Sequence, residues 1–266
     1  MQDIINEKRH AIAGCAGWNH IALGTVGSTN TLALELARHG DLGQVWITAE
    51  EQTAGKARRG RDWVSKPGNL FASCLLIDPA PADRLGTLPL VVSLALFKAV
   101  GAVAPHLAQD MSIKWPNDVL LRGAKLSGIL LEATSTPQGA AAVVIGCGVN
   151  CAHAPQQALY KTTSLLQEGA SVPPMTLFNQ LARCLADELD IWNRGVNFSA
   201  VRAQWLAAAS GLGSPVIVRL PDTELTGVFH DLDEEGYLLL KDENTGAIQR
   251  ISAADIFFAR DDQLGA

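Results

Sequence analysis

The amino-acid sequence predicts an α+β protein in which a mixed central β-sheet flanked by helices precedes a small C-terminal β-barrel. Runs of β-forming residues alternate with segments of helical periodicity through most of the chain. After a break rich in Gly and Ser at 210–215, only short β-type runs separated by turns follow. We therefore place a boundary near residue 212 and expect a larger domain at 1–212 and a smaller one at 213–266.

The first elements surround two polar motifs. After "GSTN" (27–30), residues 31–40 carry apolar side chains near helical spacing and end in Gly, which predicts a short helix. Residues 44–50 are rich in β-forming types and predict a strand that runs directly into the segment "TAGKARRGRDW" (53–63). The next strand is expected at 69–77, after the turn residues "PGN".

The middle of the chain predicts buried helices and further strands. Residues 85–97 are apolar and uncharged, but the run is shorter than the roughly 20 residues of a membrane-spanning helix, so we expect a core helix. Leucine recurs at every fourth position from Leu177 to Leu189, which predicts a long helix over 173–192. Further strands are expected at 112–115, 125–133 and 141–148, a second helix at 197–209, and barrel strands in "VIVRL", "LTGVFHDL", "GYLLLK", "AIQRI" and "DIFFAR".

Composition argues against several classes of function. The 266 residues carry a formal net charge of -6, with 48% hydrophobic and 18% charged residues, an ordinary globular balance. Such a chain lacks the net basic field of a general nucleic-acid or membrane-surface binder, so neither partner is expected. Residues 6–10 are polar where a signal peptide would be apolar, which indicates a cytoplasmic protein.

The cysteines predict no disulfide framework. All five are scattered, and no CxxC pair occurs, so buried reduced thiols are the preferred interpretation. Cys147, Cys151 and His153 are conceivable metal ligands, but no fourth ligand is evident. No fixed metal site is therefore expected.

The segment 53–63 gathers positive charge on a backbone with little side-chain bulk. Four of the six residues from Lys56 to Arg61 are basic, and the others are Gly and Ala. Small residues let a ligand approach the backbone, and guanidinium forks match phosphate or carboxylate oxygens. The segment suits a loop that holds a phosphate-bearing intermediate, although a solvated surface loop explains it about as well. The Walker A pattern is absent, which excludes a P-loop.

Two further motifs place polar groups beside buried strands. "KWPND" (114–118) combines a cation, an indole, an amide and a carboxylate around a proline. Lys125 enters an otherwise apolar strand, where its charge is costly unless it meets an anion or extends to solvent. "VVIGCGVN" (143–150) ends an apolar run in Gly-x-Gly-x-Asn, which permits close ligand approach but also fits a plain strand-to-turn transition.

The order of the motifs is more specific than any one of them. "GSTN", "QTAGKARRGRDW", "KWPNDVL", "KLSGILLE" and "GCGVN", in sequence from 27 to 150, resemble the biotin protein ligases. The resemblance implies a class II synthetase-like catalytic domain that binds biotin and ATP at 1–212 and an SH3-like barrel at 213–266. It implies attachment of biotin to one lysine of a biotin carboxyl-carrier protein through biotinyl-5'-AMP, with release of pyrophosphate and then AMP.

The resemblance also implies the co-substrate and the site residues. ATP with Mg²⁺ is the expected co-substrate and biotin the substrate, with no tightly bound prosthetic group and with Mg²⁺ near Asp118. Lys125 and Arg58 are the expected catalytic residues, because Lys125 would bridge the biotin carboxyl and the α-phosphate while Arg58 would retain the adenylate. The expected biotin-binding residues are Ser28, Thr29, Asn30, Gln52, Lys125, Gly128, Gly146 and Gly148. The expected ATP- and adenylate-binding residues are Gly55, Lys56, Ala57, Arg58, Arg61, Trp63, Lys114, Asn117, Asp118, Asn150 and Arg260.

One departure from the family pattern concerns the basic loop. The family loop usually reads Gly-Arg-Gly-Arg-Arg-Gly-Arg, whereas Lys56 and Ala57 stand here at its second and third positions. Lysine keeps the charge without the bidentate fork, and alanine disfavours positive φ, so a looser hold on the adenylate is expected.

Alternatives to this function are a lipoate–protein ligase, which shares the fold and chemistry, and a non-catalytic ligand-binding module. The residues before Gly27 show no helix-turn-helix, so ligase activity without DNA-binding repression is expected. The carrier domain of a biotin-dependent carboxylase is the expected partner, and the sequence leaves homodimerisation open.

Overall fold

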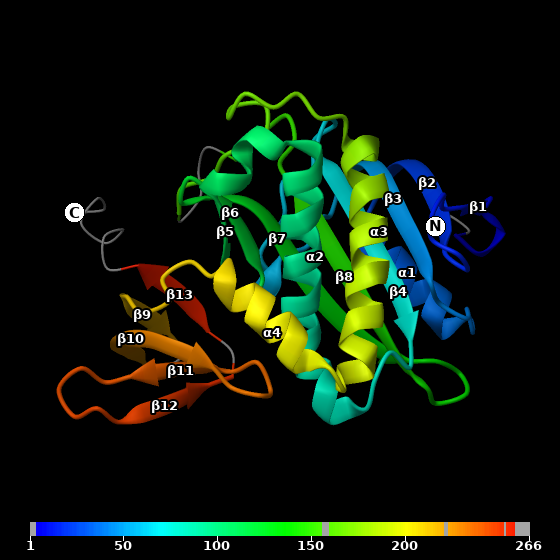
Figure 1. The fold of residues 1–266 in the computed structure, drawn as a ribbon. Coiled ribbons are helices and arrows are strands. Elements are labelled where there is room, and N and C mark those ends of the chain that lie inside the picture. Colours follow the sequence, from blue (N-terminus) through cyan, green and yellow to red (C-terminus); the bar gives the residue numbers. More distant parts are fainter. Residues whose placement is uncertain (1–3, 156–159, 221–222, 253, 259–266) are drawn as a thin grey trace.

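The larger domain is built on an eight-stranded mixed sheet (Figure 1). The protein is described here from a computed structural model that covers residues 4–155, 160–220, 223–252 and 254–258. In spatial order the strands are β1 (His10–Ala11), β2 (Asn19–Val26), β3 (Val45–Gln52), β4 (Leu70–Ile77), β8 (Ala141–Val149), β7 (Ala124–Ser135), β6 (Asp118–Leu121) and β5 (Met111–Lys114). Only β2 and β3 pair in parallel among these described strands, and the other neighbours are antiparallel.

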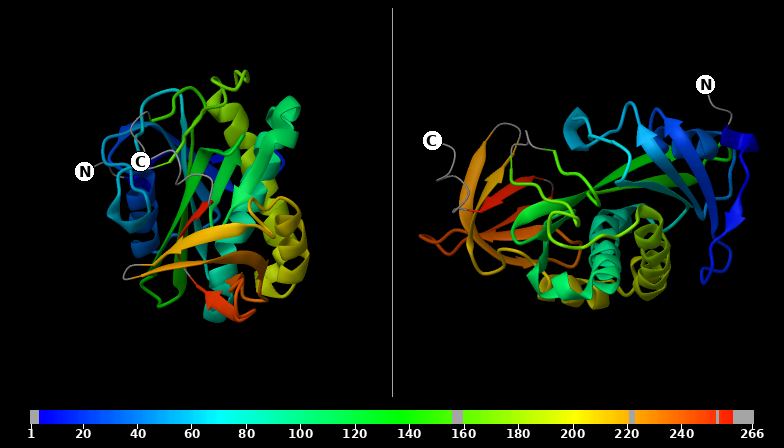
Figure 2. Two further views of the ribbon diagram at one scale, coloured as in Figure 1. Left: turned by 90° about the vertical axis from the view of Figure 1, so that its left-hand side faces the viewer. Right: turned by 90° about the horizontal axis from the view of Figure 1, so that it is seen from above.

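Helices cover both faces of this sheet (Figure 2). One face carries α1 (Thr29–Arg38), and the other carries α2 (Leu88–Val103) and α3 (Pro174–Trp192). Helix α4 (Phe198–Ala207) packs against α2 and α3. The short 3₁₀ helices are η1 (Ile4–Asn6), η2 (Arg58–Gly60), η3 (Ala82–Thr87), η4 (Pro105–Asp110) and η5 (Asn193–Gly195). The result is a three-layer arrangement of helix, sheet and helices.

Two apolar cores follow from the alternation of side chains along the strands. On β3, the fully buried Trp46 packs into the core under α2 and α3, whereas Val45 and Ile47 pack into the core under α1. On β8, Ile145 and Val144 divide between the cores in the same way. Successive strand residues point to opposite faces, so a sheet covered on both sides needs apolar residues at consecutive positions.

Helix α2 belongs to the core. Among the described residues, Ala82–Val103 is long and apolar enough to cross a membrane, but 61% of its most apolar window is buried inside the fold. The helix packs against α3, α4, β5, β6 and β7. Apolar side chains all round a helix are what burial in a core demands, as the sequence predicts.

The C-terminal domain is a five-stranded antiparallel sheet. Its strands lie in the order β12 (Ile248–Ile251), β11 (Leu238–Lys241), β10 (Glu224–Leu232), β9 (Pro215–Arg219) and β13 (Asp255–Phe258). The indole N–H of Trp115 donates to the carbonyl of Gly236 at 3.0 Å, which fixes the β5–β6 turn to this domain. The predicted architecture of a mixed sheet with flanking helices and a small C-terminal β-domain is confirmed.

Candidate functional site

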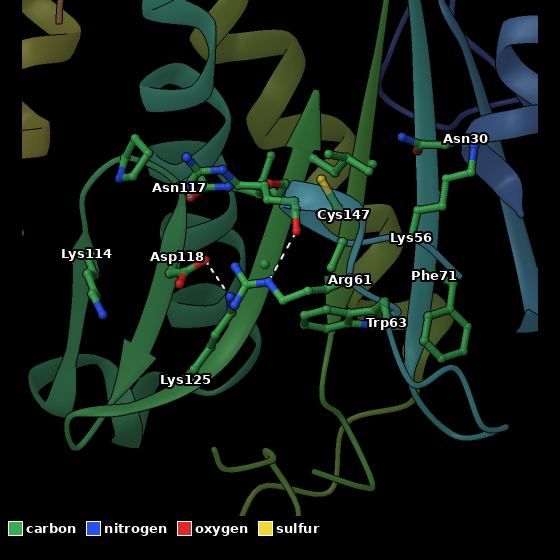
Figure 3. Close-up of a pocket in the computed structure, with 18 of the residues that line it drawn as sticks. Asn30, Lys56, Arg61, Trp63, Phe71, Lys114, Asn117, Asp118, Lys125 and Cys147 are labelled. Carbon is green, nitrogen blue, oxygen red and sulfur yellow. Dashed lines mark hydrogen bonds and ion pairs between the residues drawn. The ribbon is translucent and has the colours of Figure 1, made fainter. Parts of the chain in front are cut away.

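A pocket that opens to solvent lies where the basic loop, the β5–β6 turn and strands β4, β7 and β8 meet (Figure 3). Two C-terminal residues, Ile256 and Phe257 of β13, complete its wall. The structure brings most of the sequence-predicted site residues to this pocket: Ser28, Thr29, Asn30, Gln52, Lys56, Ala57, Arg58, Arg61, Trp63, Lys114, Asn117, Asp118, Lys125, Gly128, Gly146 and Gly148.

Among the described residues, the predicted Gly55 and Asn150 do not line this pocket. Gly55 is buried beneath the loop, and a Cβ there would lie 2.6 Å from the carbonyl of Trp63, so its role is to let the loop close on itself. Asn150 lines a neighbouring cavity, and its amide donates to the carbonyl of Thr163 at 3.0 Å. Arg260 lies outside the described residues.

The polar end of the pocket is built at the junction between β2 and α1. Ser28 caps α1, and its hydroxyl accepts from the backbone N–H of Thr31 at 3.5 Å. The backbone N–H of Thr29 donates to Gln52 Oε1 at 2.9 Å, and the Thr29 hydroxyl oxygen lies 3.0 Å from the same atom. The Gln52 amide donates in turn to Ser65 Oγ at 2.9 Å. The polar end is therefore rigid and joined to the far end of the basic loop.

Asn30 lies against β8 because Gly146 has no side chain. A Cβ on Gly146 would lie 2.3 Å from Asn30 Oδ1. The buried Ser73 hydroxyl lies 2.5 Å from the same oxygen and 2.7 Å from Thr29 Oγ1, and the Asn30 amide nitrogen donates to Glu132 Oε2 at 2.8 Å. Gly146 thus makes room for a protein side chain, in place of the direct ligand contact expected from the sequence.

Lys125 is held at the middle of the pocket by an anion and a phenol. Its ammonium lies 2.8 Å from Asp118 Oδ1 (Figure 3) and 3.4 Å from the Tyr160 hydroxyl. Burial alone would lower the pKa of Lys125, but Asp118 and Tyr160 outweigh burial, and the pKa lies above its ordinary value. The buried lysine meets an anion, as its position in the sequence demands, and is a fixed cation at neutral pH.

The basic loop folds back as a tight hairpin. Lys56 and Asp62 pair as an antiparallel bridge, and the turn between them places Arg59 at φ 58°. Ala57 has φ -122°, which any residue adopts, so the expected conformational penalty of alanine at this position is wrong. The Arg58 guanidinium donates to Asn117 Oδ1 at 3.0 Å, and Asn117 donates to the carbonyl of Ile129. The loop is thereby tied to the "KWPND" turn.

The Trp63 indole packs flat into the pocket. A Cβ on Gly148 would lie 2.5 Å from this ring, and one on Gly128 would lie 2.9 Å from it. The Lys125 ammonium is 5.8 Å from the ring centroid. The two glycines therefore admit the aromatic ring to the surface of the sheet.

Sequence reasoning missed Tyr160 and Phe257, two aromatic residues that lie against lysines of the site. The Tyr160 ring lies 5.0 Å from the Lys125 ammonium and 5.8 Å from that of Lys114, and the Phe257 ring lies 5.2 Å from Lys114. Neither aromatic falls in a motif, so no sequence signal distinguishes it from a core residue. The other unpredicted lining residues are Phe71, Ala72, Trp115, Pro116, Ile129, Leu130, Cys147, Ala254 and Ile256.

The described residues of this pocket offer neither a thiolate at neutral pH nor a cluster of metal-ligating side chains. Burial raises the pKa of Cys147 to about 12, so its thiol stays protonated at neutral pH. No group of three or more His, Cys, Asp or Glu side chains within the described ranges is placed to hold a metal ion. The described pocket offers fixed cations and hydrogen-bond donors, which can stabilise negative charge on oxygen atoms.

Comparison with known proteins agrees with this geometry. Residues 24–150 match the biotin/lipoate A/B protein ligase family, and residues 211–259 match the biotin protein ligase C-terminal domain. A biotin--[acetyl-CoA-carboxylase] ligase of Paracoccus denitrificans is 38% identical over 87% of this chain and 97% of its own length. A ligase of the same name from Mycobacterium tuberculosis is 33% identical over 94% of this chain and 92% of its own.

Solved structures give the same answer. The biotin protein ligase from Aquifex aeolicus in complex with biotin and ATP superimposes with a TM-score of 0.74 at 26% identity, covering 90% of this chain and 97% of that one. The pocket, the two domain matches and relatives that align over nearly their whole length point the same way. The chain belongs to the biotin protein ligase family.

Proposed function

We infer that this protein uses ATP to attach biotin to a lysine of a biotin carboxyl-carrier protein, through biotinyl-5'-AMP. The observation that carries the inference is the Lys125 ammonium, buried at the middle of the pocket between a polar end and a loop rich in arginine and lysine. A carboxylate is a poor acyl donor, and conversion to an acyl-adenylate supplies a good leaving group. The site supplies cations where that conversion needs them.

In the first step, a carboxylate oxygen of biotin attacks the α-phosphorus of ATP, and the bond to pyrophosphate breaks. Negative charge builds on the phosphate oxygens, so fixed cations lower the barrier. We propose that Lys125 lies between the carboxylate and the α-phosphate, that Arg58 holds the adenylate, and that Lys114 and Asn117 orient the phosphates. Mg²⁺ would enter with ATP. We propose that it lies near Asp118, the carboxylate that pairs with Lys125.

In the second step, the neutral amine of the carrier lysine attacks the acyl carbon of biotinyl-5'-AMP. The C–O bond to AMP breaks, the amine loses a proton to solvent, and an amide and AMP result. The protein must then keep water away from the mixed anhydride until the carrier arrives. We propose that the basic loop, with Arg61 and Trp63, covers the adenylate and that the indole stacks on adenine.

The rest of the proposal assigns regions and partners. Ser28, Thr29, Asn30 and Gln52 would contact the ureido end of biotin, whose two N–H donors and one carbonyl need polar partners. Residues 1–212 would form the catalytic domain, and 213–266 the C-terminal domain. The partner is the carrier domain of a carboxylase, with the protein in the cytoplasm and no nucleic-acid partner proposed.

Pyrophosphate release tests this function. The protein with ATP and Mg²⁺ is expected to release pyrophosphate when biotin is added, and to transfer biotin to a carrier domain. Replacing biotin by lipoate in this assay distinguishes a biotin ligase from a lipoate–protein ligase. The match of residues 211–259 to the biotin protein ligase C-terminal domain supports biotin as the substrate. Turnover with lipoate alone, or ligand binding with no release of pyrophosphate, would contradict the proposal.

A further inference from the structure

We propose that Glu132 is a positioning residue that fixes the amide orientation of Asn30 for biotin recognition and couples this amide to the basic loop. Glu132 lies on β7, outside the pocket lining and outside every residue predicted from the sequence. The proposal rests on the proposed function, since it takes the polar end of the pocket to bind the ureido ring.

The hydrogen bonds around Asn30 allow one orientation of its amide. Its Nδ2 faces Glu132 Oε2 at 2.8 Å, and its Oδ1 faces the hydroxyl of Ser73 at 2.5 Å. An ionised carboxylate only accepts hydrogen bonds, so it requires the NH₂ group on its side and sends the carbonyl oxygen toward Ser73. Without the carboxylate, an amide can rotate by half a turn and exchange its donor for its acceptor.

This orientation decides what the pocket can accept. Asn30 Oδ1 has two lone pairs, of which Ser73 uses one, so an acceptor remains for an N–H of a urea-like ring. A rotated Asn30 amide would present its own N–H to the ring N–H of the ligand. The two donors repel each other, and both are left unpaired in a buried site. The backbone at Gly146, within van der Waals reach of this amide, allows no compensating movement in that direction.

The second oxygen of Glu132 reaches the basic loop. Lys56 Nζ lies 3.8 Å from Oε1, and the Lys56 side chain runs from the loop toward Asn30 in Figure 3. The Lys56 side chain is 46% exposed, so the ion pair contributes only a small effect, a factor of about 5 at most. One carboxylate therefore joins the residue that reads the ligand to the loop that closes over it.

Three variants separate the two contacts. Glu132→Ala removes both, Glu132→Gln keeps an oxygen for Asn30 but loses the charge that faces Lys56, and Lys56→Gln breaks the ion pair alone. Glu243→Gln is the matched control, because it removes the same charge from the exposed β11–β12 turn. For each protein, the measurements are KM for biotin and kcat in pyrophosphate release, and the dissociation rate of biotinyl-5'-AMP.

Glu132→Ala is expected to raise KM for biotin about 10-fold or more, with kcat within about 3-fold. Glu132→Gln should restore KM to within about 2-fold of wild type, while raising adenylate dissociation by up to about 5-fold. Lys56→Gln should raise the rate of adenylate dissociation equally. The double variant Glu132→Gln/Lys56→Gln should release the adenylate no faster than either single variant.

An unchanged KM in Glu132→Ala would overturn the inference, as would equal losses in Glu132→Ala and Glu132→Gln or additive effects with Lys56→Gln. These failures leave the proposed function intact, provided that the wild-type protein turns over. A wild-type protein that releases no pyrophosphate with biotin would overturn both.

Discussion

Single residues in this site are placed by physical demands that the sequence already contains. A lysine in an apolar strand needs an anion, and Asp118, seven positions earlier in the chain, provides it. No sequence signal predicts the place of Tyr160. This residue reaches Lys125 only because the segment after β8 folds back across β7. Close approaches, such as that of Asn30 to Gly146, likewise depend on tertiary packing and not on a motif.

The ionisation of Lys125 gives a prediction with a definite sign. Its pKa is raised in the folded protein, so its charge stabilises the fold at neutral pH, and this contribution is lost only as pH rises through the folded pKa. In Asp118→Asn the desolvation remains and its largest opposing contribution disappears, so the pKa should fall. The alkaline limb of the pH profile for pyrophosphate release should move to lower pH, whereas Glu243→Gln should leave it in place. An unmoved limb with reduced kcat would show that Asp118 acts only on Mg²⁺ or phosphate.

Gly146→Ala tests the close contact beneath Asn30. The new methyl would lie 2.3 Å from Asn30 Oδ1, so the amide must shift away from β8. We expect a loss of about 1–3 kcal/mol in the free energy of unfolding, measured by urea denaturation, together with a raised KM for biotin. Gly24→Ala, in β2, is the control without a clash, because an added Cβ there meets no atom within 4 Å and φ is not positive. A KM for biotin that Gly146→Ala leaves unchanged would show that Asn30 does not contact the ligand.

Elements with a strong apolar pattern can be predicted from the sequence, whereas weakly patterned strands cannot. Burial on both faces gives a strand a continuous apolar run, and burial of one stripe gives a helix apolar residues at helical spacing. These patterns predict the strands at 44–50 and 69–77 and the helix at 173–192. β2 and β6 were not predicted, because β2 alternates weakly around Gly24 and β6 is only four residues long beside a proline turn. Pairing in a sheet stabilises such segments. β2 pairs in parallel with β3, which α1 separates from it in the chain, and β6 pairs with its chain neighbours β5 and β7.

The hairpin of the basic loop predicts different outcomes for its two small residues. Ala57→Gly should not slow adenylate dissociation, because Ala57 already has an unstrained φ of -122°. Gly55→Ala should speed dissociation about 10-fold or more, because its Cβ would lie 2.5 Å from Ser65 Oγ and 2.6 Å from the Trp63 carbonyl and would open the hairpin. Stopped-flow tryptophan fluorescence, recorded as the adenylate leaves the pocket beside Trp63, measures both rates. Tighter retention by Ala57→Gly would restore the interpretation that the family glycine is conformationally required here.

The C-terminal sheet contacts the β5–β6 turn, which carries Lys114 of the pocket. Trp115 is a buried residue of "KWPND", and its indole N–H donates to Gly236 of the β10–β11 connection. Phe257 of β13 lies against the Lys114 ammonium. Composition predicts a boundary near residue 212, but the contact between Trp115 and Gly236 could not be predicted, because it joins residues 121 apart in sequence.

Trp115→Phe tests whether this contact positions the phosphate-facing groups. The change leaves the Gly236 carbonyl without its donor, at a cost of about 1–3 kcal/mol in unfolding free energy, and should loosen Lys114 and Asn117. Trp46→Phe is the matched control, since Trp46 is equally buried and its indole N–H has no hydrogen-bond partner among the described residues. KM for ATP should rise several-fold in Trp115→Phe and stay unchanged in Trp46→Phe, with KM for biotin unchanged in both. If both variants lost stability equally and kept KM for ATP, Trp115 would be a packing residue and the C-terminal domain would not position the nucleotide through this turn.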